Sequence, residues 1–157
     1  MFLFFFNGER IDARTLANYI IQTATSTGSK ISNTKLQKIL YYVQGHYLAR
    51  FGHPLFPEEI HAWAFGPAVP DVYYTFSCFG SAPLRVLDMP DMSSLPEEEM
   101  DFVDQVIRSK LAFSMMDLAN ATRKESPWLN ATDNGRTIRQ FQVIPLESLK
   151  DFFKQKE

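Results

Sequence analysis

Cysteine and histidine are scarce in this sequence of 157 residues, which limits the chemistry that the chain can perform. A single cysteine, Cys78, excludes a disulfide within the chain and is typical of a reducing compartment, so we expect a cytoplasmic protein. Its aromatic neighbours predict a buried, unreactive thiol. The three histidines, His46, His53 and His61, are not spaced as metal ligands on a helix or a hairpin are, so we expect no metal site.

Long apolar runs and an excess of positive charge are also missing. No stretch approaches the roughly 20 apolar residues that cross a bilayer, and the apolar opening at residues 1–6 is too short for a signal-peptide core, so no membrane association is expected. For this opening we consider two structures, a buried strand over residues 2–6 and an exposed arm that contacts a partner. The net charge of −2 provides no basic field for phosphate backbones, which disfavours nucleic acid as a partner.

Motifs of common catalytic sites are absent as well. The sequence contains no Gly-x-Ser-x-Gly elbow, no Gly-x-x-x-x-Gly-Lys phosphate loop and no Gly-x-Gly-x-x-Gly turn. The acidic run at residues 97–99 is explained by a helix start, where carboxylates meet the positive end of the helix dipole. We therefore expect a non-enzymatic protein that uses no cofactor.

Apolar residues recur at helical spacing along most of the chain. This pattern predicts a mainly α protein, a compact single-domain helical bundle over residues 1–157 with a small β element. Ser94 is the predicted N-cap of the fourth helix, and Gly45, inside the second, predicts a close approach by another element. Long helices are predicted over residues 12–26, 32–51 and 94–111, and a shorter one over residues 116–123. Two further helices are predicted, a short one that begins at Pro67 or Pro70 and a last one that begins at Pro145. Short strands are predicted near residues 2–6, 60–65 and 84–87.

Polar and aromatic residues run beside the apolar stripe of the predicted helix 32–51. At 100° per residue they form a band that the core covers only partly. In one interpretation the tyrosine rings pack on the strand and the glutamines bond to loop backbone. In the other, the band is one wall of a partner-binding groove whose other wall comes from the strand and the short helix after it. The candidate partner-binding residues are Gln37, Lys38, Tyr41, Tyr42, Gln44, Trp63, Phe65 and Tyr73.

Two segments form a long and specific motif, and a third extends it more loosely. They read Leu36-Gln37-Lys38-Ile39-Leu40-Tyr41-Tyr42-Val43-Gln44-Gly45, then Glu59-Ile60-His61-Ala62-Trp63-Ala64-Phe65-Gly66-Pro67, then Lys124-Glu125-Ser126-Pro127-Trp128. In these residues the chain resembles the Panacea domain, the family of SocA-like antitoxins and phage-associated proteins of bacteria. The resemblance covers the chain from about residue 12 onward and leaves the apolar start at residues 1–7 outside the motif.

The resemblance implies a compact, mostly helical domain that binds another protein and catalyses no reaction. It implies an antitoxin that neutralises a cognate protein toxin encoded nearby, or an adaptor that delivers this toxin to an AAA+ protease. Because the family pairs with many unrelated toxins, the resemblance identifies neither the toxin nor the oligomeric state. An alternative is a DNA-binding regulator of its own operon, for which the sequence offers the basic residues Arg123, Lys124, Arg136 and Arg139.

Overall fold

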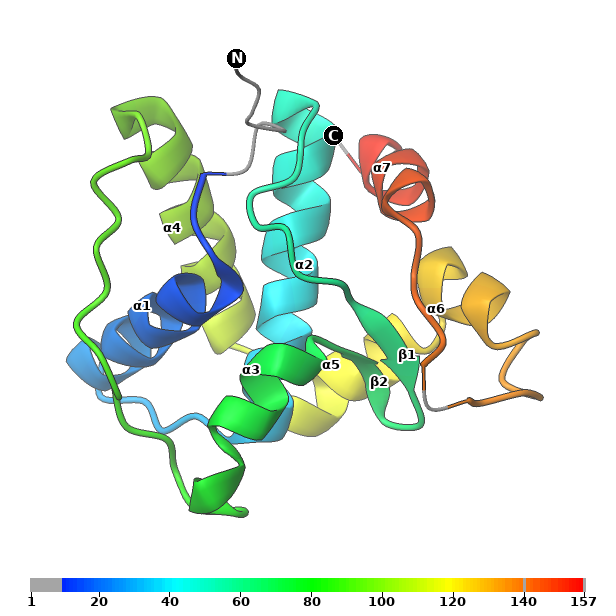
Figure 1. Cartoon of the computed structure of the whole chain (residues 1–157), viewed down its shortest axis with the longest axis horizontal. Helices are drawn as coiled ribbons and strands as arrows, with labels where there is room; N and C mark the ends of the chain where they lie inside the picture. Colours follow the sequence, from blue (N-terminus) through cyan, green and yellow to red (C-terminus); the bar gives the residue numbers. More distant parts are fainter. Residues whose placement is uncertain (1–9, 140, 157) are drawn as a thin grey trace.

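Helices make up most of the structure, a computed structural model that describes residues 10–139 and 141–156 (Figure 1). The predicted fold class, mainly α with a small β element, is confirmed. Within the described residues the elements are α1 (Ala13–Ser26), α2 (Asn33–Phe51), β1 (His61–Trp63), β2 (Gly66–Ala68), α3 (Pro70–Thr75), the 3-10 helix η2 (Ser77–Phe79), α4 (Glu97–Leu111), α5 (Met115–Thr122), α6 (Ser126–Ala131) and α7 (Leu146–Lys154).

The helix α2 is the centre of the fold. Ser32 begins it by accepting a hydrogen bond from the Lys35 amide, and Gly52 ends it with a left-handed φ of 85°. Helices α1, α3, α4, α5 and α7 and strand β2 all contact it, so α2 stands between two groups of helices in Figure 1. Because neighbours surround α2, every residue from 36 to 48 except His46 is buried. The core therefore encloses this helix instead of lying along one face.

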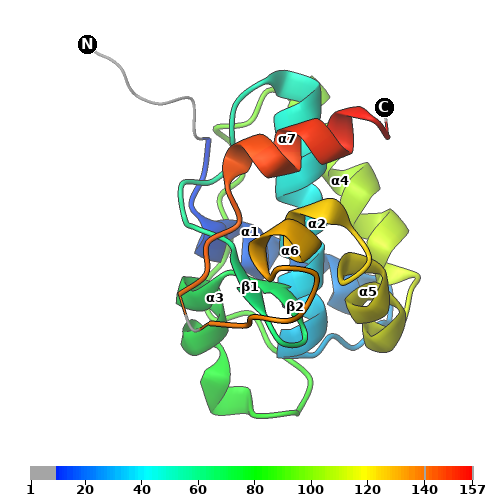
Figure 2. The same ribbon diagram turned by 90° about the vertical axis from the view of Figure 1, so that its right-hand side faces the viewer.

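Helix α7 lies across α2, as Figure 2 shows. The two helices approach closely at Gly45, where an added Cβ atom would overlap the ring of Phe153. Glycine in a helix costs up to about 1 kcal/mol relative to alanine, and here it makes room for an aromatic ring. The close approach predicted at Gly45 is therefore confirmed.

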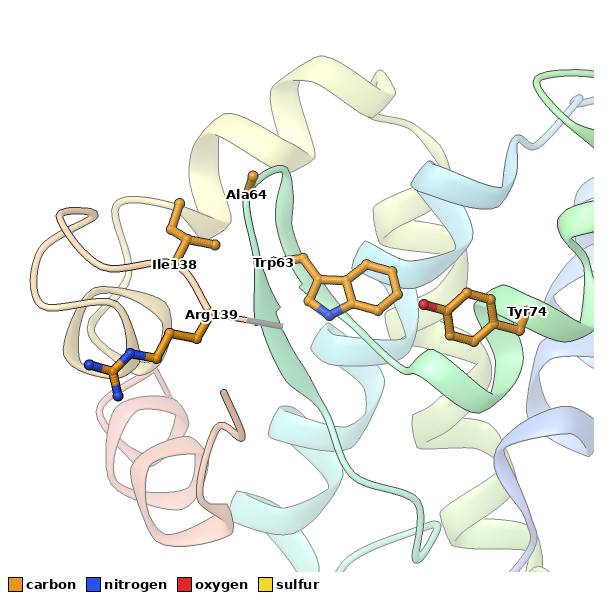
Figure 3. Close-up of a pocket in the computed structure, with 5 residues that line it drawn as sticks. All are labelled: Trp63, Ala64, Tyr74, Ile138 and Arg139. Atoms are coloured by element: carbon orange, nitrogen blue, oxygen red, sulfur yellow. The ribbon is translucent and has the colours of Figure 1, made fainter. Parts of the chain in front are cut away.

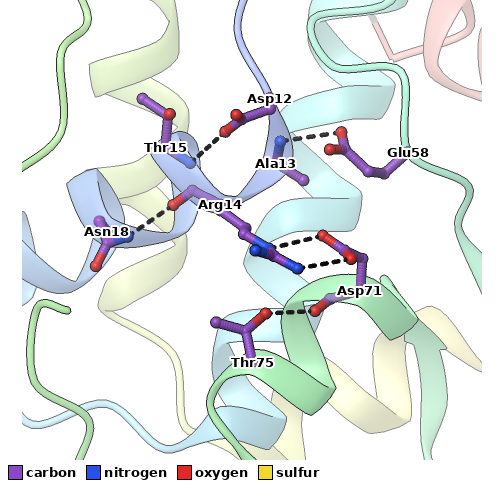
Figure 4. A network of polar contacts seen from close by, with 8 residues as sticks. All are labelled: Asp12, Ala13, Arg14, Thr15, Asn18, Glu58, Asp71 and Thr75. Atoms are coloured by element: carbon purple, nitrogen blue, oxygen red, sulfur yellow. Dashed lines mark hydrogen bonds and ion pairs between the residues drawn. The ribbon is translucent and has the colours of Figure 1, made fainter. Parts of the chain in front are cut away.

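Helix α1 is joined to the loop before the sheet and to α3 by polar contacts (Figure 4). The Arg14 guanidinium donates two hydrogen bonds of 3.0 Å to the Asp71 carboxylate, and the Ala13 amide donates to Glu58 Oε1 at 3.0 Å. Asp12 caps the helix by accepting from the Thr15 amide at 2.8 Å. These contacts fix the start of α3, the helix that follows the hairpin.

The two strands form an antiparallel hairpin whose register pairs His61 with Ala68, Ala62 with Pro67 and Trp63 with Gly66. Proline has no N–H to donate, and at position 67 it stands on the strand whose outer edge faces α2. The other edge of the hairpin is covered by residues 142–144. There Ala62 N donates to Gln142 O and Ile144 N donates to Ile60 O, both at 2.8 Å.

Several predicted elements differ from the observed ones. The strand predicted at 60–65 ends at Trp63, because residues 64 and 65 form the hairpin turn. The strand predicted at 84–87 is wrong: the Leu84 amide donates to Ile31 O and the Leu87 amide to Asn18 Oδ1, so this segment packs on α1 without a strand partner. The strand predicted at 2–6 lies outside the described residues.

The start of α4 also differs from the prediction. Pro96 takes the N-cap position without a side-chain hydrogen bond, whereas Ser94 Oγ donates to the carbonyl oxygen of Arg10. The acidic residues 97–99 do occupy the first turn, as expected from the helix dipole. None of the described helices combines the length and the apolar character that a bilayer crossing requires.

Candidate functional site

The hairpin tip is held firmly against α5 and α6. Trp128 Nε1 donates to the Trp63 carbonyl at 2.8 Å, and Arg123 Nη1 donates to the Ala64 carbonyl at 3.3 Å. Gly66 has a φ of 113°, and a Cβ atom there would lie 2.7 Å from Thr122 Oγ1. Only glycine fits this backbone and this spacing, so the tip projects its side chains from a fixed position.

Four aromatic residues gather around the tip, and we call them the Trp63 surface: Trp63, Phe65, Tyr73 and Tyr74. The Trp63 ring centroid lies 5.1 Å from that of Tyr73 and 6.1 Å from that of Tyr74, and the two tyrosine rings are 5.6 Å apart. Phe65 is 70% exposed and Tyr74 is 60% exposed. Apolar rings that pack together and remain open to solvent are typical of protein-binding surfaces.

Two pockets adjoin the Trp63 indole. In the larger, of about 270 Å³, Figure 3 shows the indole between Tyr74 and the pair Ile138 and Arg139. The smaller has a volume of about 120 Å³. The larger is lined by Trp63, Ala64, Tyr74, Ile138 and Arg139, and the smaller by Thr34, Gln37, Lys38, Trp63, Phe65, Gly66, Ala68 and Tyr73.

Lys38 and Gln37 connect α2 to the segment 67–69 beneath the smaller pocket. Lys38 is 2% exposed, and its Nζ donates to the Pro67 carbonyl at 2.9 Å. Burial, helped by repulsion from Arg123, lowers the pKa of Lys38 to about 7. Gln37 Oε1 accepts from the Val69 amide at 2.8 Å. Both side chains thus satisfy backbone groups on the side of β2 that has no neighbouring strand.

Tyr41 and Tyr42 are buried on another side of α2, where they bind one carboxylate. Tyr41 OH donates to Glu125 Oε1 at 2.9 Å and Tyr42 OH donates to Glu125 Oε2 at 2.8 Å. Burial and the negative charge of Glu125 raise the pKa of both phenols, and burial raises the pKa of Glu125. Lys110 Nζ lies 4.2 Å from the Tyr42 ring centroid. This cluster joins α2 to the start of α6.

Gln44 is also used internally. Its Oε1 accepts from the Leu55 amide at 2.8 Å, and its Nε2 donates to the Phe56 carbonyl at 2.8 Å. The interpretation that the glutamines satisfy loop backbone is therefore confirmed for Gln37 and Gln44. The rings of Tyr41 and Tyr42 pack against Phe153 of α7, and their packing on the strand stays a prediction.

The eight predicted partner-binding residues thus divide into two groups. Gln37 and Lys38 meet Trp63, Phe65 and Tyr73 around the smaller pocket, as the groove hypothesis expects. Tyr41, Tyr42 and Gln44 do not line that pocket, because α7, α6 and the loop before β1 cover them. Partner binding by any of the eight stays a prediction. Sequence reasoning did not place Tyr74, Ile138 or Arg139 in the groove, although Tyr74 directly follows a predicted residue and Arg139 was considered for DNA binding.

Other candidate residues have ordinary surroundings. Cys78 is exposed, which corrects the expected burial, because η2 turns it outward. Burial, with repulsion from Lys110, lowers the pKa of His46 to about 4, so this imidazole is neutral at pH 7. Among the side chains of residues 10–139 and 141–156, no three of the types that bind metals lie close enough together to hold an ion.

The basic residues considered for DNA binding are partly occupied within the protein. Arg136 pairs with Asp133 at 3.4 Å, and Arg123 donates to Ala64 O and Asn120 Oδ1. DNA binding stays a prediction, and the pair between Arg136 and Asp133 reduces the charge available for phosphates.

Comparisons with known proteins identify the relatives of the chain. The family model described as "Antitoxin SocA-like, Panacea domain" matches residues 36–129, which include the hairpin, Lys38 and Glu125. Antitoxin SocA of Caulobacter vibrioides (strain NA1000 / CB15N) is 42% identical over 131 residues, covering 76% of this chain and 70% of the relative. No solved structure gives a significant match. These matches confirm the resemblance inferred from the motif.

Proposed function

The chain belongs to the family of SocA-like antitoxins with a Panacea domain, and from this membership we propose that it binds a protein toxin and neutralises it without catalysing a reaction. Membership supports an antitoxin role and implies a partner toxin. The finer proposal is that neutralisation is stoichiometric, with the toxin held by surface contacts. An interface of this kind buries about 1,200–2,000 Å² in total.

The observation that carries the proposal is the Trp63 surface. Phe65 and Tyr74 expose most of their rings to solvent, where they add nothing to the core, although burying an aromatic side chain contributes about 1.5–3 kcal/mol. The hydrogen bonds to the Trp63 and Ala64 carbonyls hold the hairpin that carries Trp63 and Phe65 in place before any partner arrives. A preformed surface loses little entropy on binding, which favours a tight complex.

Two modes of neutralisation follow from the same complex. The bound antitoxin covers the working surface of the toxin, or it delivers the toxin to an AAA+ protease. Both require binding first, so binding is the step to test. A host strain that lacks the protease separates them, because only the covering mode protects cells there.

The test is co-expression with the product of the neighbouring gene. The chain should restore growth of cells that make this toxin and should co-purify with it in a 1:1 ratio. Leu40→Asn is a useful negative control, because Leu40 is fully buried and a polar amide there should unfold the protein and abolish protection. If the folded wild-type chain neither protects cells nor co-purifies with the toxin, the proposed function is wrong.

A further inference from the structure

The ionisable side chains that line the two pockets beside Trp63 are basic. The exposed Arg139 lines the larger, the buried Lys38, with its pKa lowered to about 7, lines the smaller, and no carboxylate is among the described residues that line either. Arg123 adds a second guanidinium at the hairpin turn. The chain as a whole has 18 acidic and 16 basic residues, so the positive charge of this surface is opposite to the net charge of the protein. A partner that meets this surface is expected to bring negative charge.

The pockets differ in shape and chemistry. The smaller, of about 120 Å³, is close in size to a cavity of about 150 Å³ that holds benzene, so it fits one apolar side chain between Trp63, Phe65 and Tyr73. The larger, of about 270 Å³, combines the Tyr74 ring with the exposed Arg139 guanidinium. Guanidinium groups bind carboxylates by two parallel hydrogen bonds.

We propose that these pockets form one docking site for a segment of a protein partner, which places an apolar side chain in the smaller pocket and a carboxylate beside Arg139 in the larger. This inference rests on the proposed function, because the partner is taken to be the toxin. Trp63 contacts both parts of the segment. The apolar anchor supplies affinity, and the carboxylate selects segments of the correct charge.

A protein segment suits this surface better than a nucleic acid does. Binding to nucleic acid relies on many phosphate contacts, and the charge of Arg136 is already paired with Asp133. The smaller pocket admits one side chain, whereas a base that stacks needs an open platform.

The first experiment uses the complete chain and the toxin encoded by the neighbouring gene. Phe65→Ser and Arg139→Glu should each weaken binding by about 10-fold or more, because one loses an apolar wall and the other reverses the attractive charge. The matched controls are Met89→Ser and Arg85→Glu, which make similar changes at exposed positions on the loop between η2 and α4. Circular dichroism verifies that all four variants are folded.

The second experiment does not need the toxin. A pentapeptide with a phenylalanine between glutamates and its lysine counterpart are titrated into the ¹⁵N-labelled chain. The protein has two tryptophans and Trp128 is buried, so the indole N–H signal of Trp63 reports directly on the site. The acidic peptide should shift this signal at a concentration at least about 10-fold lower than the basic one, and Arg139→Glu should remove the preference.

The outcomes separate the two proposals. If wild-type chain neutralises the toxin but the Phe65 and Arg139 variants bind as the controls do, the docking site is wrong and the proposed function stands. If the wild-type chain does not bind the toxin, the function is wrong, and the peptide titration alone decides the docking site. Equal shifts with both peptides, no shift with either, or a stronger shift with a single-stranded oligonucleotide would overturn the docking proposal.

Discussion

Lys38 should make the stability of this protein depend on pH in a way that a single substitution removes. Its side chain is 2% exposed and donates one hydrogen bond, to the Pro67 carbonyl. Burial, with repulsion from Arg123, lowers its pKa from 10.5 to about 7, whereas the pKa in the unfolded chain returns to its ordinary value. Lys38→Met keeps a long flexible side chain and removes the titrating group.

The direction in which pH changes the stability follows from proton binding by Lys38. Between pH 7 and pH 10.5 the unfolded chain holds a proton on Lys38 that the folded chain has released, so the free energy of unfolding rises with pH. Below about pH 7 Lys38 is protonated in both the folded and the unfolded chain, and its buried charge lowers the stability of the folded chain by roughly 3–6 kcal/mol. Each unit of difference between the two pKa values corresponds to about 1.4 kcal/mol. From pH 6 to pH 9 the wild-type chain should gain about 2–3 kcal/mol relative to Lys38→Met.

In the assay, both proteins are unfolded in urea at several pH values from 6 to 9, and circular dichroism monitors the unfolding. The difference between the two free energies of unfolding cancels the titration of all other groups, and the Arg123 guanidinium stays charged throughout. At pH 6 the variant should be the more stable protein, although the unpaired Pro67 carbonyl costs it about 1–3 kcal/mol. Lys30→Met controls for the change of side chain at an exposed position. A difference that does not change with pH would refute the assignment of a depressed pKa to Lys38.

Three further substitutions test other contacts by urea unfolding. Gly45→Ala should lower the free energy of unfolding by about 1–3 kcal/mol, because the added methyl group overlaps the Phe153 ring; unchanged stability would place α7 elsewhere. Glu125→Gln should cost about 1–3 kcal/mol, since an amide offers one acceptor oxygen to two buried phenols, and a neutral result would show that the phenols have other acceptors. Arg14→Ala should cost less than about 1 kcal/mol, because its pair with Asp71 is exposed, and added salt should reduce that small loss.

The local parts of the fold could be predicted from sequence because their signals are local. Asp12, Ser32 and Gly52 set the ends of α1 and α2 by contacts within four residues, and the predicted ranges 12–26 and 32–51 agree closely with these helices. The segment 84–87 has the composition of a strand, but a strand also needs a neighbour with free backbone groups. Its amides found acceptors on residue 31 and on Asn18 instead, which no local pattern reveals.

The candidate site was predicted in part for the same reason. Trp63 and Phe65 belong to the segment predicted as a strand and Tyr73 to the short helix directly after it, so their nearness in sequence placed them together. The polar and aromatic band on α2 is fully buried, whereas its spacing predicts partial cover. Periodicity describes the faces of one helix and carries no information on how many neighbours pack against it. The acceptor of the two tyrosine hydroxyls, Glu125, is more than 80 residues away in the sequence, and no spacing rule links such distant positions.

The motif that identifies the family is therefore mainly architectural. Lys38 and Gln37 hold the backbone of residues 67–69, and Trp128 holds the carbonyl of Trp63, so buried polar groups determine where the hairpin lies. A buried side chain cannot distinguish one partner from another unless the fold opens. Under the proposed docking site, discrimination among toxins depends on exposed side chains that the architecture positions, such as Phe65 and Arg139. Two chains can share this scaffold and still bind unrelated toxins, because these exposed side chains can change at little cost to the core.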